Sequence, residues 1–396
     1  MPASPIRKLV PRADAAKKRG TSVYHLNIGQ PDLATPRGFF DAVRSFDAPV
    51  LEYAHSEGIG RVREAMARYY ASAGVAASPE QMVVTTGGSE ALLFALAAVT
   101  DPGDDVLVFE PYYTNYGGIG RMVGIGLAAV PTTAETGYHL PPADAIRRVV
   151  GPRTRAILAC NPGNPTGTVL SLDELRSLAA IAEERDLYFI ADEVYREFVY
   201  DGARTYSVLG PELTSLRSRA IVIDSVSKRF SLCGARVGAI VSHDQAVISS
   251  ATRMAQARLS AATLEQLGAA ALMDTPAGYY DGVRAEYQKR RDVVHRALAA
   301  MPGVTCRRPE GAFYVFAKLP LDPVDGRDSD AFAAYLLDEF SDGGETVMVA
   351  PGAGFYATPG LGRDEIRIAY VLEADKLERA MSLLALGLTA FKARRP

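Results

Sequence analysis

Cysteine is scarce in this sequence of 396 residues, which has only Cys160, Cys233 and Cys306. An odd number of widely separated cysteines argues against a disulfide framework and indicates reduced thiols in a cytoplasmic protein. Histidine is also rare, and the five histidines are scattered along the chain. Because no His, Cys and Asp residues have the spacing of a zinc or iron site, we expect no bound metal.

Long apolar runs and an excess of positive charge are lacking too. No stretch of about 18 apolar residues occurs, so we expect no membrane-spanning helix. The basic residues near the N-terminus are not followed by an apolar segment, which argues against a secretory signal. The net charge is −3 and the isoelectric point is about 6.0. The composition therefore gives no reason to expect a nucleic acid or an anionic membrane as a partner.

What the sequence does contain is an alternation of apolar, strand-like runs with helical segments. The strand-like runs are QMVVTT (81–86), DVLVFE (105–110), RAILAC (155–160), LYFIAD (187–192) and AIVIDS (220–225). Strands that are apolar throughout and separated by helices predict a mainly parallel sheet with helices on both faces, and hence an α/β fold. The run RVGAIVSH (236–243) follows too closely for a helical crossover, so we expect it to be an antiparallel neighbour.

The pattern changes near residue 277, where a long helical stretch (278–301) leads into a region of mixed strands and helices. A chain of this length suits two domains. We predict a large domain over residues 45–290 and a small α+β domain over residues 291–396. Residues 1–44 are predicted to form an N-terminal arm and part of the small domain.

Polar side chains follow four of the predicted strands. TTGGSEAL follows the first run, NPGNPTG the third, ADEVY the fourth and SVSKRF the fifth. Ligands of open parallel sheets bind outside the carboxyl ends of the strands, so we expect the four segments to meet in one crevice. The candidate site residues in the last three segments are Asn164, Asp192, Tyr195, Ser225 and Lys228.

Lys228 follows a buried strand and has Arg236 eight residues further on. Gly88 and Ser89 are placed at a predicted helix N-terminus, where free N–H groups and the helix dipole bind phosphate. Arg236 would add a bidentate phosphate contact, and Ser225 would add a hydroxyl. A lysine beside a phosphate site can form an imine with a phosphorylated aldehyde.

The remaining candidates suit the ring of such an aldehyde. Asp192 can keep a pyridine nitrogen protonated, and Tyr195 can hydrogen-bond a phenolic oxygen on the ring. Tyr113, in EPYYTNY, offers an aromatic face for stacking. Together these requirements describe pyridoxal 5′-phosphate, which we predict as the cofactor.

The same segments give the chain a resemblance to a known family. LNIGQPDLATP, YAHSEGIG, TTGGSEAL, EPYY, NPGNPTG, ADEVY, SVSKRFSLCGARVG, GAFYVF and IRIAYV follow one another over nearly the whole chain. In order and spacing they resemble the class I/II aminotransferases, pyridoxal-phosphate enzymes of fold type I close to aspartate and aromatic aminotransferases. The resemblance implies a homodimer with composite active sites. It also implies ping-pong transfer of an amino group between an L-amino acid and a 2-oxo acid such as 2-oxoglutarate.

Matched residue by residue, the resemblance implies a role for each candidate in holding the cofactor. Lys228 would be joined to it covalently, and Asp192 would pair with the ring nitrogen. Tyr195 and Asn164 would contact the ring oxygen, and Tyr113 would stack on the ring. The phosphate would be held by Gly88, Ser89, Ser225 and Arg236.

The resemblance also implies residues for the substrate and for the partner subunit. Arg367, in IRIAY, would bind the α-carboxylate near Asn164, and Gly29 lies on the arm that would close over it. Tyr53, in LEYAHSEG, would reach the cofactor phosphate of the neighbouring subunit. Ser89 stands where some aspartate-preferring relatives have a lysine, and no second cation marks a site for a side-chain carboxylate. Aspartate-like and aromatic substrates therefore both remain open.

Two alternatives also remain open. Another reaction of the same fold, such as C–S β-lysis or decarboxylation, would use the same cofactor residues. A non-catalytic sensor, as in regulators that join this fold to a DNA-binding domain, is disfavoured because the sequence begins almost directly at the arm. A nicotinamide-binding protein does not fit, since no glycine-rich turn is followed by a ribose-binding acid about twenty residues later.

Overall fold

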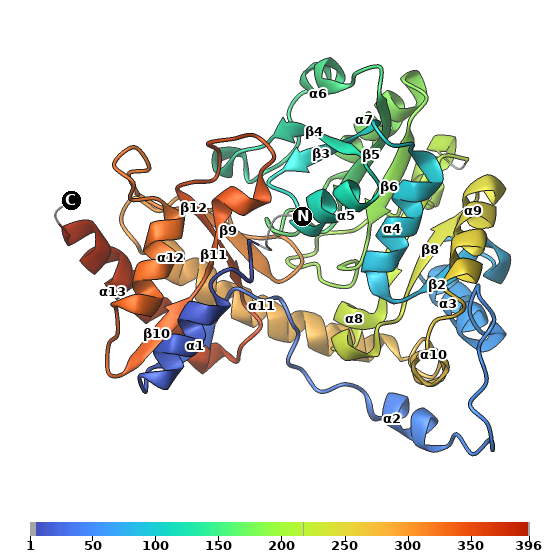
Figure 1. Cartoon of the computed structure of the whole chain (residues 1–396), viewed down its shortest axis with the longest axis horizontal. Coiled ribbons are helices and arrows are strands. Elements are labelled where there is room, and N and C mark those ends of the chain that lie inside the picture. The colour runs from blue at the N-terminus through green and yellow to red at the C-terminus, as the bar shows by residue number, and fades with distance from the viewer. Residues whose placement is uncertain (1–4, 217, 395–396) are drawn as a thin grey trace.

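A seven-stranded sheet forms the centre of the computed structural model, which describes residues 5–216 and 218–394 (Figure 1). Its strand order is β2-β8-β7-β6-β5-β3-β4. The strands are β2 (Met82–Thr85), β3 (Asp105–Glu110), β4 (Gly126–Pro131), β5 (Thr154–Cys160), β6 (Tyr188–Asp192), β7 (Ala220–Ser225) and β8 (Gly238–Ser242).

Neighbouring strands of this sheet are parallel except beside β8, which is antiparallel to both β2 and β7. The predicted α/β class and the antiparallel neighbour are both confirmed. The return from β7 to β8 pairs Ser225 with Gly238, so the loop between these residues lies at one end of the sheet. The sequence does not predict β4, because its run GLAAVP has a single β-branched residue and no alternation.

Helices cover both faces of the sheet. One layer consists of α4 (Gly87–Val99), α5 (Asn115–Met122) and α9 (Gln245–Ala257), and the other of α3 (Gly60–Ser72), α6 (Ala143–Val149), α7 (Leu172–Glu184) and α10 (Thr263–Ala270). Along β7, Ile221 and Ile223 face the first layer, whereas Ala220 and Val222 face the second. Because successive side chains of a strand point to opposite faces, burial on both faces requires a run that is apolar throughout.

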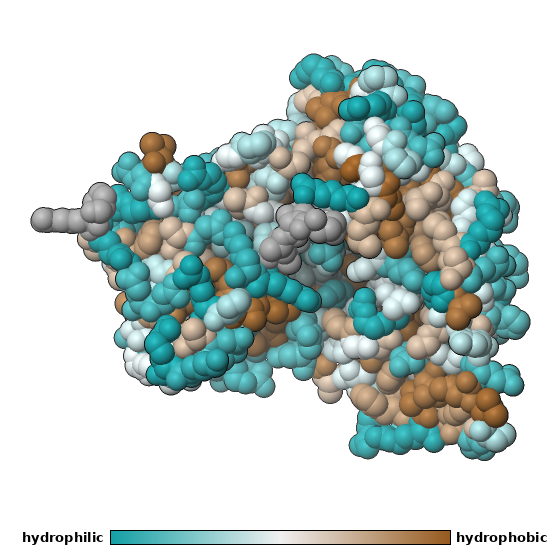
Figure 2. Space-filling view, viewed as in Figure 1, coloured by the Kyte–Doolittle hydropathy of each residue, from teal (hydrophilic) through white to brown (hydrophobic). Residues whose placement is uncertain are grey.

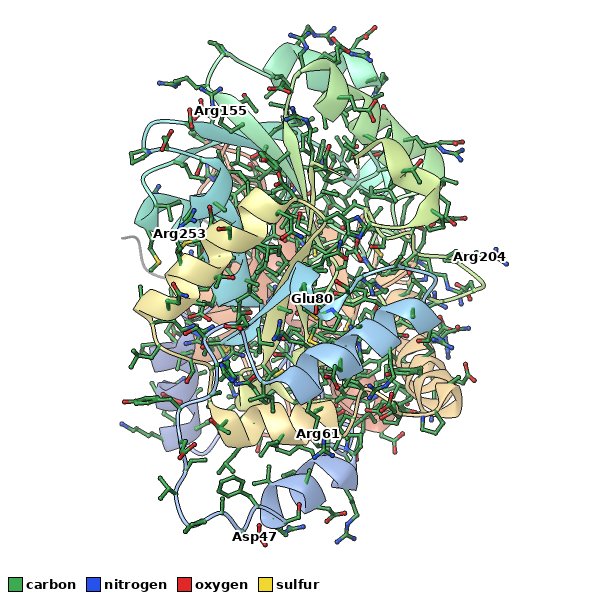
Figure 3. The ribbon with its side chains drawn as sticks, turned by 90° about the vertical axis from the view of Figure 1, so that its right-hand side faces the viewer. Asp47, Arg61, Glu80, Arg155, Arg204 and Arg253 are labelled. Carbon is green, nitrogen blue, oxygen red and sulfur yellow. The ribbon has the colours of Figure 1, made fainter. Side chains whose placement is uncertain are left out.

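The outer surfaces of these helices carry charged side chains. Arg61 on α3 and Arg253 on α9 are exposed on the side of the molecule shown in Figure 3. α7 begins with a capping box, in which Ser171 and Glu174 each accept a hydrogen bond from the backbone N–H of the other.

A second core lies beside the sheet, where the N-terminal segment meets the last third of the chain (Figure 1). β1 (Ser22–His25) is parallel to β10 (Glu345–Met348), and β12 (Glu365–Ala369) lies between β11 (Ala350–Pro351) and β9 (Tyr314–Lys318). The helices are α1 (Val10–Lys18), α11 (Ala277–Ala299), α12 (Ser329–Asp338) and α13 (Ala374–Ala393). α11 is continuous across residue 290, and the division of the chain into three ranges stays a prediction.

The remaining elements are short. α2 (Arg37–Arg44) lies on an extended segment at the lower right of Figure 1, and α8 (Val226–Arg229) directly follows β7. The 3₁₀ helices are η1 (Pro79–Gln81), η2 (Ala134–Thr136), η3 (Pro211–Leu216), η4 (Cys233–Ala235) and η5 (Gly352–Phe355). Within the described ranges, no helix is long and apolar enough to cross a bilayer, and no three His, Cys, Asp or Glu side chains are arranged to hold a metal ion.

Candidate active site

The predicted site segments meet at the carboxyl ends of three adjacent strands. β5, β6 and β7 are parallel, and Cys160 at the end of β5 pairs with Asp192 at the end of β6. Asp192 in turn pairs with Ile223, two residues before the end of β7. The turns that carry Asn164, Tyr195 and Lys228 therefore leave the sheet side by side, as the sequence predicts.

The first turn of α4 faces the loop between β7 and β8. A Cβ atom on Gly87 would lie 2.4 Å from Arg236 Nη2, and one on Gly88 would lie 3.7 Å from Ser225 Cβ. The first N–H groups of a helix have no intrahelical partner, and here they lie next to the guanidinium of Arg236, which donates to the carbonyl oxygens of Cys233 and Thr86. Ser89 is exposed on the same turn. These residues form a corner suited to an anion such as phosphate.

The hydroxyl of Ser225 lies in this corner but already has partners. It caps α8 by accepting a hydrogen bond from the Ser227 N–H, and it lies 2.8 Å from Ser227 Oγ and 3.1 Å from the Val237 carbonyl oxygen. An anion in the corner would therefore compete with the loop for this hydroxyl.

Asp192 is a buried carboxylate that forms no ion pair within the described part of the chain, although the positive charge of Lys228 acts on it. Tyr116 donates a hydrogen bond of 2.7 Å to it, and the Val194 N–H lies 3.5 Å away. Burial raises the pKa of Asp192 to about 6, against the effect of these hydrogen bonds. A buried carboxylate that has no ion-pair partner is well placed to pair with a positively charged group of a ligand.

Lys228 reaches from α8 toward the N-terminal segment. Its ammonium donates a hydrogen bond of 2.9 Å to the Gly29 carbonyl and lies 3.8 Å from Cys233 Sγ. Burial lowers the pKa of Lys228, and the positive charge of Arg367 acts in the same direction. A lowered pKa increases the fraction of neutral amine, the form that acts as a nucleophile and as a base.

Arg367 on β12 is 2% exposed and has no acidic partner among the residues described. It donates to Asn164 Oδ1 at 2.9 Å and to the Asn27 carbonyl at 2.6 Å, and its Nε is buried without a partner. Its guanidinium carbon lies 4.6 Å from the ring centroid of Tyr314. A buried arginine with hydrogen-bonding capacity to spare is suited to binding a carboxylate.

Tyr195 and Tyr314 connect the two halves of the site. Their hydroxyls are hydrogen-bonded at 3.0 Å, and Tyr314 also packs against Gly29, where a Cβ atom would lie 1.9 Å from its hydroxyl oxygen. Tyr314 and Tyr116 are site residues that the sequence analysis misses. The available signals were GAFY, which is a weak motif by itself, and the spacing of three residues between Tyr113 and Tyr116.

Tyr113 and Tyr53 differ sharply in their surroundings. Tyr113 meets the ring of Tyr116 edge-on at 5.6 Å, and the pKa of its hydroxyl is raised by burial and by the charge of Asp192, which places it at the site. Tyr53 is 82% exposed on the segment between α2 and α3, and it makes no side-chain hydrogen bond within the described ranges. The structure does not bring Tyr53 to the site of its own chain.

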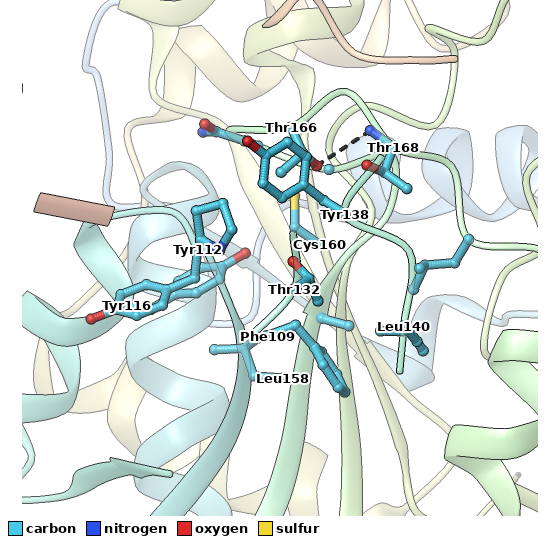
Figure 4. Close-up of a pocket in the computed structure, with 15 residues that line it drawn as sticks. Phe109, Tyr112, Tyr116, Thr132, Tyr138, Leu140, Leu158, Cys160, Thr166 and Thr168 are labelled. Carbon is cyan, nitrogen blue, oxygen red and sulfur yellow. Dashed lines mark hydrogen bonds between the residues drawn. The ribbon is translucent and has the colours of Figure 1, made fainter. Parts of the chain in front are cut away.

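A small cavity of about 50 Å³ opens next to the site (Figure 4). Its wall includes Tyr138, Cys160, Tyr116 and Asn164. Tyr116 is hydrogen-bonded to Asp192, and Asn164 is hydrogen-bonded to Arg367. Lys228 and Asp192 do not line it. The cavity therefore adjoins the candidate active site and is separate from the space around Lys228.

Pyridoxal 5′-phosphate fits the chemistry of these groups. The corner at α4 suits its phosphate, the unpaired carboxylate of Asp192 suits a protonated ring nitrogen, and Lys228 suits its aldehyde. Tyr195 lies on the turn that directly follows Asp192, and Asn164 lies on the turn after the neighbouring strand β5.

Comparison with known proteins gives the same answer over nearly the full length. The family model for class I and II aminotransferases matches residues 21–384. The aspartate/prephenate aminotransferase of Thermus thermophilus is 31% identical over 93% of this chain and 92% of its own. Aromatic-amino-acid aminotransferase 2 of Thermococcus litoralis is 31% identical over 96% of this chain and 94% of its own.

Solved structures of aminotransferases have the same fold. A structure of Thermus thermophilus aspartate aminotransferase with maleate has a TM-score of 0.86 and 28% identity, and the match covers 98% of this chain and 97% of that one. The alanine aminotransferase of Pyrococcus furiosus has a TM-score of 0.88 at 28% identity, with the same coverage. The chain thus belongs to the class I and II aminotransferases, enzymes of fold type I that use pyridoxal 5′-phosphate.

Proposed function

We propose that this aminotransferase moves the amino group of an aspartate-like or aromatic L-amino acid to a 2-oxo acid such as 2-oxoglutarate, with Lys228 as the lysine that carries the cofactor. The observation that carries the proposal is a pair of basic side chains that form no ion pair within the described ranges: the half-buried Lys228, whose pKa is lowered, and the buried Arg367. One suits proton transfer at Cα, and the other suits the α-carboxylate of the amino acid.

The bound cofactor supplies an electron-withdrawing ring that stabilises negative charge at the substrate Cα. In the proposed mechanism, Arg367 binds the α-carboxylate and fixes the direction in which the Cα–H bond points. Lys228 would take the proton from Cα of the amino acid in the first half-reaction and would deliver a proton to Cα of the 2-oxo acid in the second. Asp192 would hold a proton on the ring nitrogen of the bound cofactor, because a buried negative charge favours the protonated form of a neighbouring base. Tyr195 and Asn164 hydrogen-bond the ring oxygen.

The phosphate assignment uses the remaining candidates. We infer that the N–H groups of the first turn of α4, at Gly88 and Ser89, bind phosphate oxygens together with Arg236 and the hydroxyl of Ser225. Tyr113 is proposed to stack on the ring. The free approach of Arg236 to Gly87, at a position where no side chain intervenes, supports this assignment.

The groups around Arg367 are expected to determine which amino donor binds. The named relatives act on aspartate, prephenate and aromatic amino acids. The contacts of Arg367 described here are to amide and carbonyl oxygens and to the rings of Tyr314 and Phe355. Aromatic neighbours favour an aromatic donor, whereas the relatives favour aspartate, so both belong in one panel of donors with 2-oxoglutarate as the acceptor.

We also propose that the active form is a homodimer in which Tyr53 reaches the cofactor phosphate of the partner subunit. Tyr53 lies in an exposed apolar stretch with Val50 and Leu51, close in sequence to the exposed Phe40 of α2. Figure 2 shows apolar surface at the lower right, where α2 and this segment lie. An exposed apolar surface of this kind marks an interaction site.

The three free cysteines support a cytoplasmic location.

Labelling of the lysine tests the proposal. Borohydride treatment of the cofactor-loaded enzyme is expected to fix the cofactor to the peptide that contains Lys228, and Lys228→Ala is expected to remain folded without turnover. A label on another lysine would refute the assignment. Without an acceptor, the enzyme should release one 2-oxo acid per bound cofactor. Continuous release of ammonia or carbon dioxide instead would point to a lyase or a decarboxylase.

A further inference from the structure

Lys228 stands on a helix that is too short to be rigid by itself. α8 has four residues, Val226–Arg229, and thus about one turn. One turn has few internal hydrogen bonds, so its geometry depends on contacts made by its side chains. Lys228 points to the Gly29 carbonyl on the substrate side, whereas its neighbour Arg229 is 2% exposed and points into the protein core.

Arg229 is bound to the last aspartate of the preceding strand. Its Nη2 donates to both carboxylate oxygens of Asp224, at 2.8 and 3.0 Å. Asp224 is fully buried and also accepts hydrogen bonds from the Ser225 N–H at 2.7 Å and from the Tyr70 hydroxyl at 3.0 Å. Asp224 precedes α8 and Arg229 is its last residue, so their ion pair forms a brace across the turn that carries Lys228.

The ion pair packs against two tyrosines of α3, Tyr69 and Tyr70. The guanidinium carbon of Arg229 lies 3.8 Å from the ring centroid of Tyr69, which is next to Tyr70 on that helix. Arg196 approaches the Tyr70 ring at 4.9 Å and pairs with the buried Glu193. The side chains of Tyr69, Tyr70, Glu193, Arg196, Asp224 and Arg229 thus form one buried cluster.

Stability is a poor explanation for the Asp224–Arg229 pair. Burial opposes the ionisation of Asp224, although Arg229 lowers its pKa, and two guanidinium nitrogens of Arg229 are buried without a hydrogen-bond partner among the described residues. A buried ion pair is often no more stabilising than apolar side chains of the same size, because both charges must be removed from water. Such a pair does impose a fixed geometry, and here it does so next to Lys228.

We propose that Asp224 and Arg229 are positioning residues that brace α8 and thereby hold Lys228 Nζ where it can reach the reacting carbon. The proposal rests on the proposed role of Lys228 as the lysine that carries the cofactor. It assigns no contact with the substrate or the cofactor to either residue.

The test compares Arg229→Met, Asp224→Asn and the double variant with a matched control, Arg291→Met. Arg291 is equally buried and also forms ion pairs, with Asp201 and Asp292, but it lies on α11. The readouts are the thermal midpoint, the pH midpoint of the absorbance change of the bound cofactor, and the rate of the half-reaction with the amino acid. Other charged or titratable groups that act on Lys228 stay unchanged, namely Cys233, Asp192, Arg236 and Arg367.

The expected signature has opposite signs in the two single variants. Arg229→Met leaves the negative charge of Asp224 unbalanced, so the pH midpoint should rise by about one unit. Asp224→Asn leaves the positive charge of Arg229 unbalanced, so the midpoint should fall, and the double variant should return near the wild-type value. All three should slow the half-reaction at least about tenfold with little change in KM, because Arg367 is untouched.

Arg291→Met should lower the thermal midpoint to a similar extent and leave both site readouts unchanged. If Arg229→Met does not fold, Arg229→Lys keeps the charge without the two-fold contact and should slow the half-reaction by a smaller factor. Folded variants with a wild-type pH midpoint and a wild-type half-reaction would overturn the proposal. Failure of the proposed function would be seen separately, because borohydride would then label another lysine in the wild type.

Discussion

The negative charge of the buried Asp192 is unfavourable in the cofactor-free protein, because burial destabilises the ionised carboxylate and so lowers the free energy of unfolding. The folded-state pKa is raised by burial to about 6, from 3.8 in an exposed carboxyl. Since the folded state binds a proton more tightly than the unfolded state, the contribution of Asp192 to stability is present at low pH. It is lost as the pH rises through the folded-state pKa.

We therefore predict that the cofactor-free wild type loses stability relative to Asp192→Asn as the pH rises. The two pKa values give a relative loss of about 2 kcal/mol between pH 4.5 and 7.5. Urea unfolding of both proteins across this range measures it, and all other groups cancel in the comparison. A difference that is flat with pH would mean that Asp192 is hydrated or paired in the folded protein.

Tyr314 offers two functions that substitution can separate. Tyr314→Phe keeps the ring beside Arg367 and removes the hydroxyl that meets Tyr195. We expect kcat to fall about fivefold with KM nearly unchanged, the effect of about 1 kcal/mol from one hydrogen bond. Tyr314→Leu also removes the ring, so KM should rise as well. Equal KM values in both variants would show that the ring does not support Arg367.

At the scale of elements, the arm and β9 meet at a contact that leaves no room for a side chain. A Cβ atom on Gly29 would lie 1.9 Å from the hydroxyl oxygen of Tyr314, so Gly29→Ala must displace the arm or the ring. The hydrogen bond from Lys228 to the Gly29 carbonyl is then lost. We expect the KM for the amino acid to rise about tenfold without loss of the fold.

Gly282→Ala is the control for this change. Gly282 lies on α11, and a Cβ atom there would meet nothing within 4 Å. Alanine is favoured over glycine inside a helix by about 0.5–1 kcal/mol, so this variant should be slightly more stable and kinetically unchanged. The measurement is the KM for the amino acid in both variants. A wild-type KM in Gly29→Ala would show that the arm does not contribute to substrate binding.

The elements differ in how well the sequence predicts them, and the reason is local. β5, β6 and β7 are predictable because burial on both faces makes each of them apolar throughout, and the polar residues at their ends follow from chain order. The neighbours of Arg367 are not predictable in this way. Asn164 and Asn27 are 203 and 340 positions away from it, and only the folded chain brings them together.

The brace under α8 shows the same limit at short range. Asp224 and Arg229 are five positions apart, yet an aspartate that ends a strand and an arginine beside a lysine are usually exposed. Their burial depends on the rings of Tyr69 and Tyr70, which come from α3. Spacing identifies residues that can meet, whereas burial depends on elements from elsewhere in the chain.

At the scale of the whole molecule, the exposed Tyr53 leads to a test with two inactive proteins. In the proposed dimer, each active site combines Lys228 of one chain with Tyr53 of the other. A heterodimer of Lys228→Ala and Tyr53→Phe chains has one site with both changes and one site with neither. We predict that mixing the two restores activity, to about half of the wild-type value per heterodimer if the sites are independent.

Subunit exchange must be shown separately, for example with chains of different tags, and Tyr53→Phe alone must reduce the activity measurably. Flat activity after proven exchange would mean that Tyr53 serves its own subunit or neither. A monomer at working concentrations with full activity would remove the composite site altogether.

The order of the strands has a consequence for a chain that is still being made on the ribosome. β2 lies at the edge of the sheet and its partner is β8, so the helix that follows β2 cannot be docked before residue 242 has emerged. The phosphate corner is complete once β8 has emerged at Ser242, whereas the carboxylate site requires Arg367. At usual rates of synthesis this interval is on the order of ten seconds. A nascent chain would thus meet its cofactor well before it could hold an amino acid.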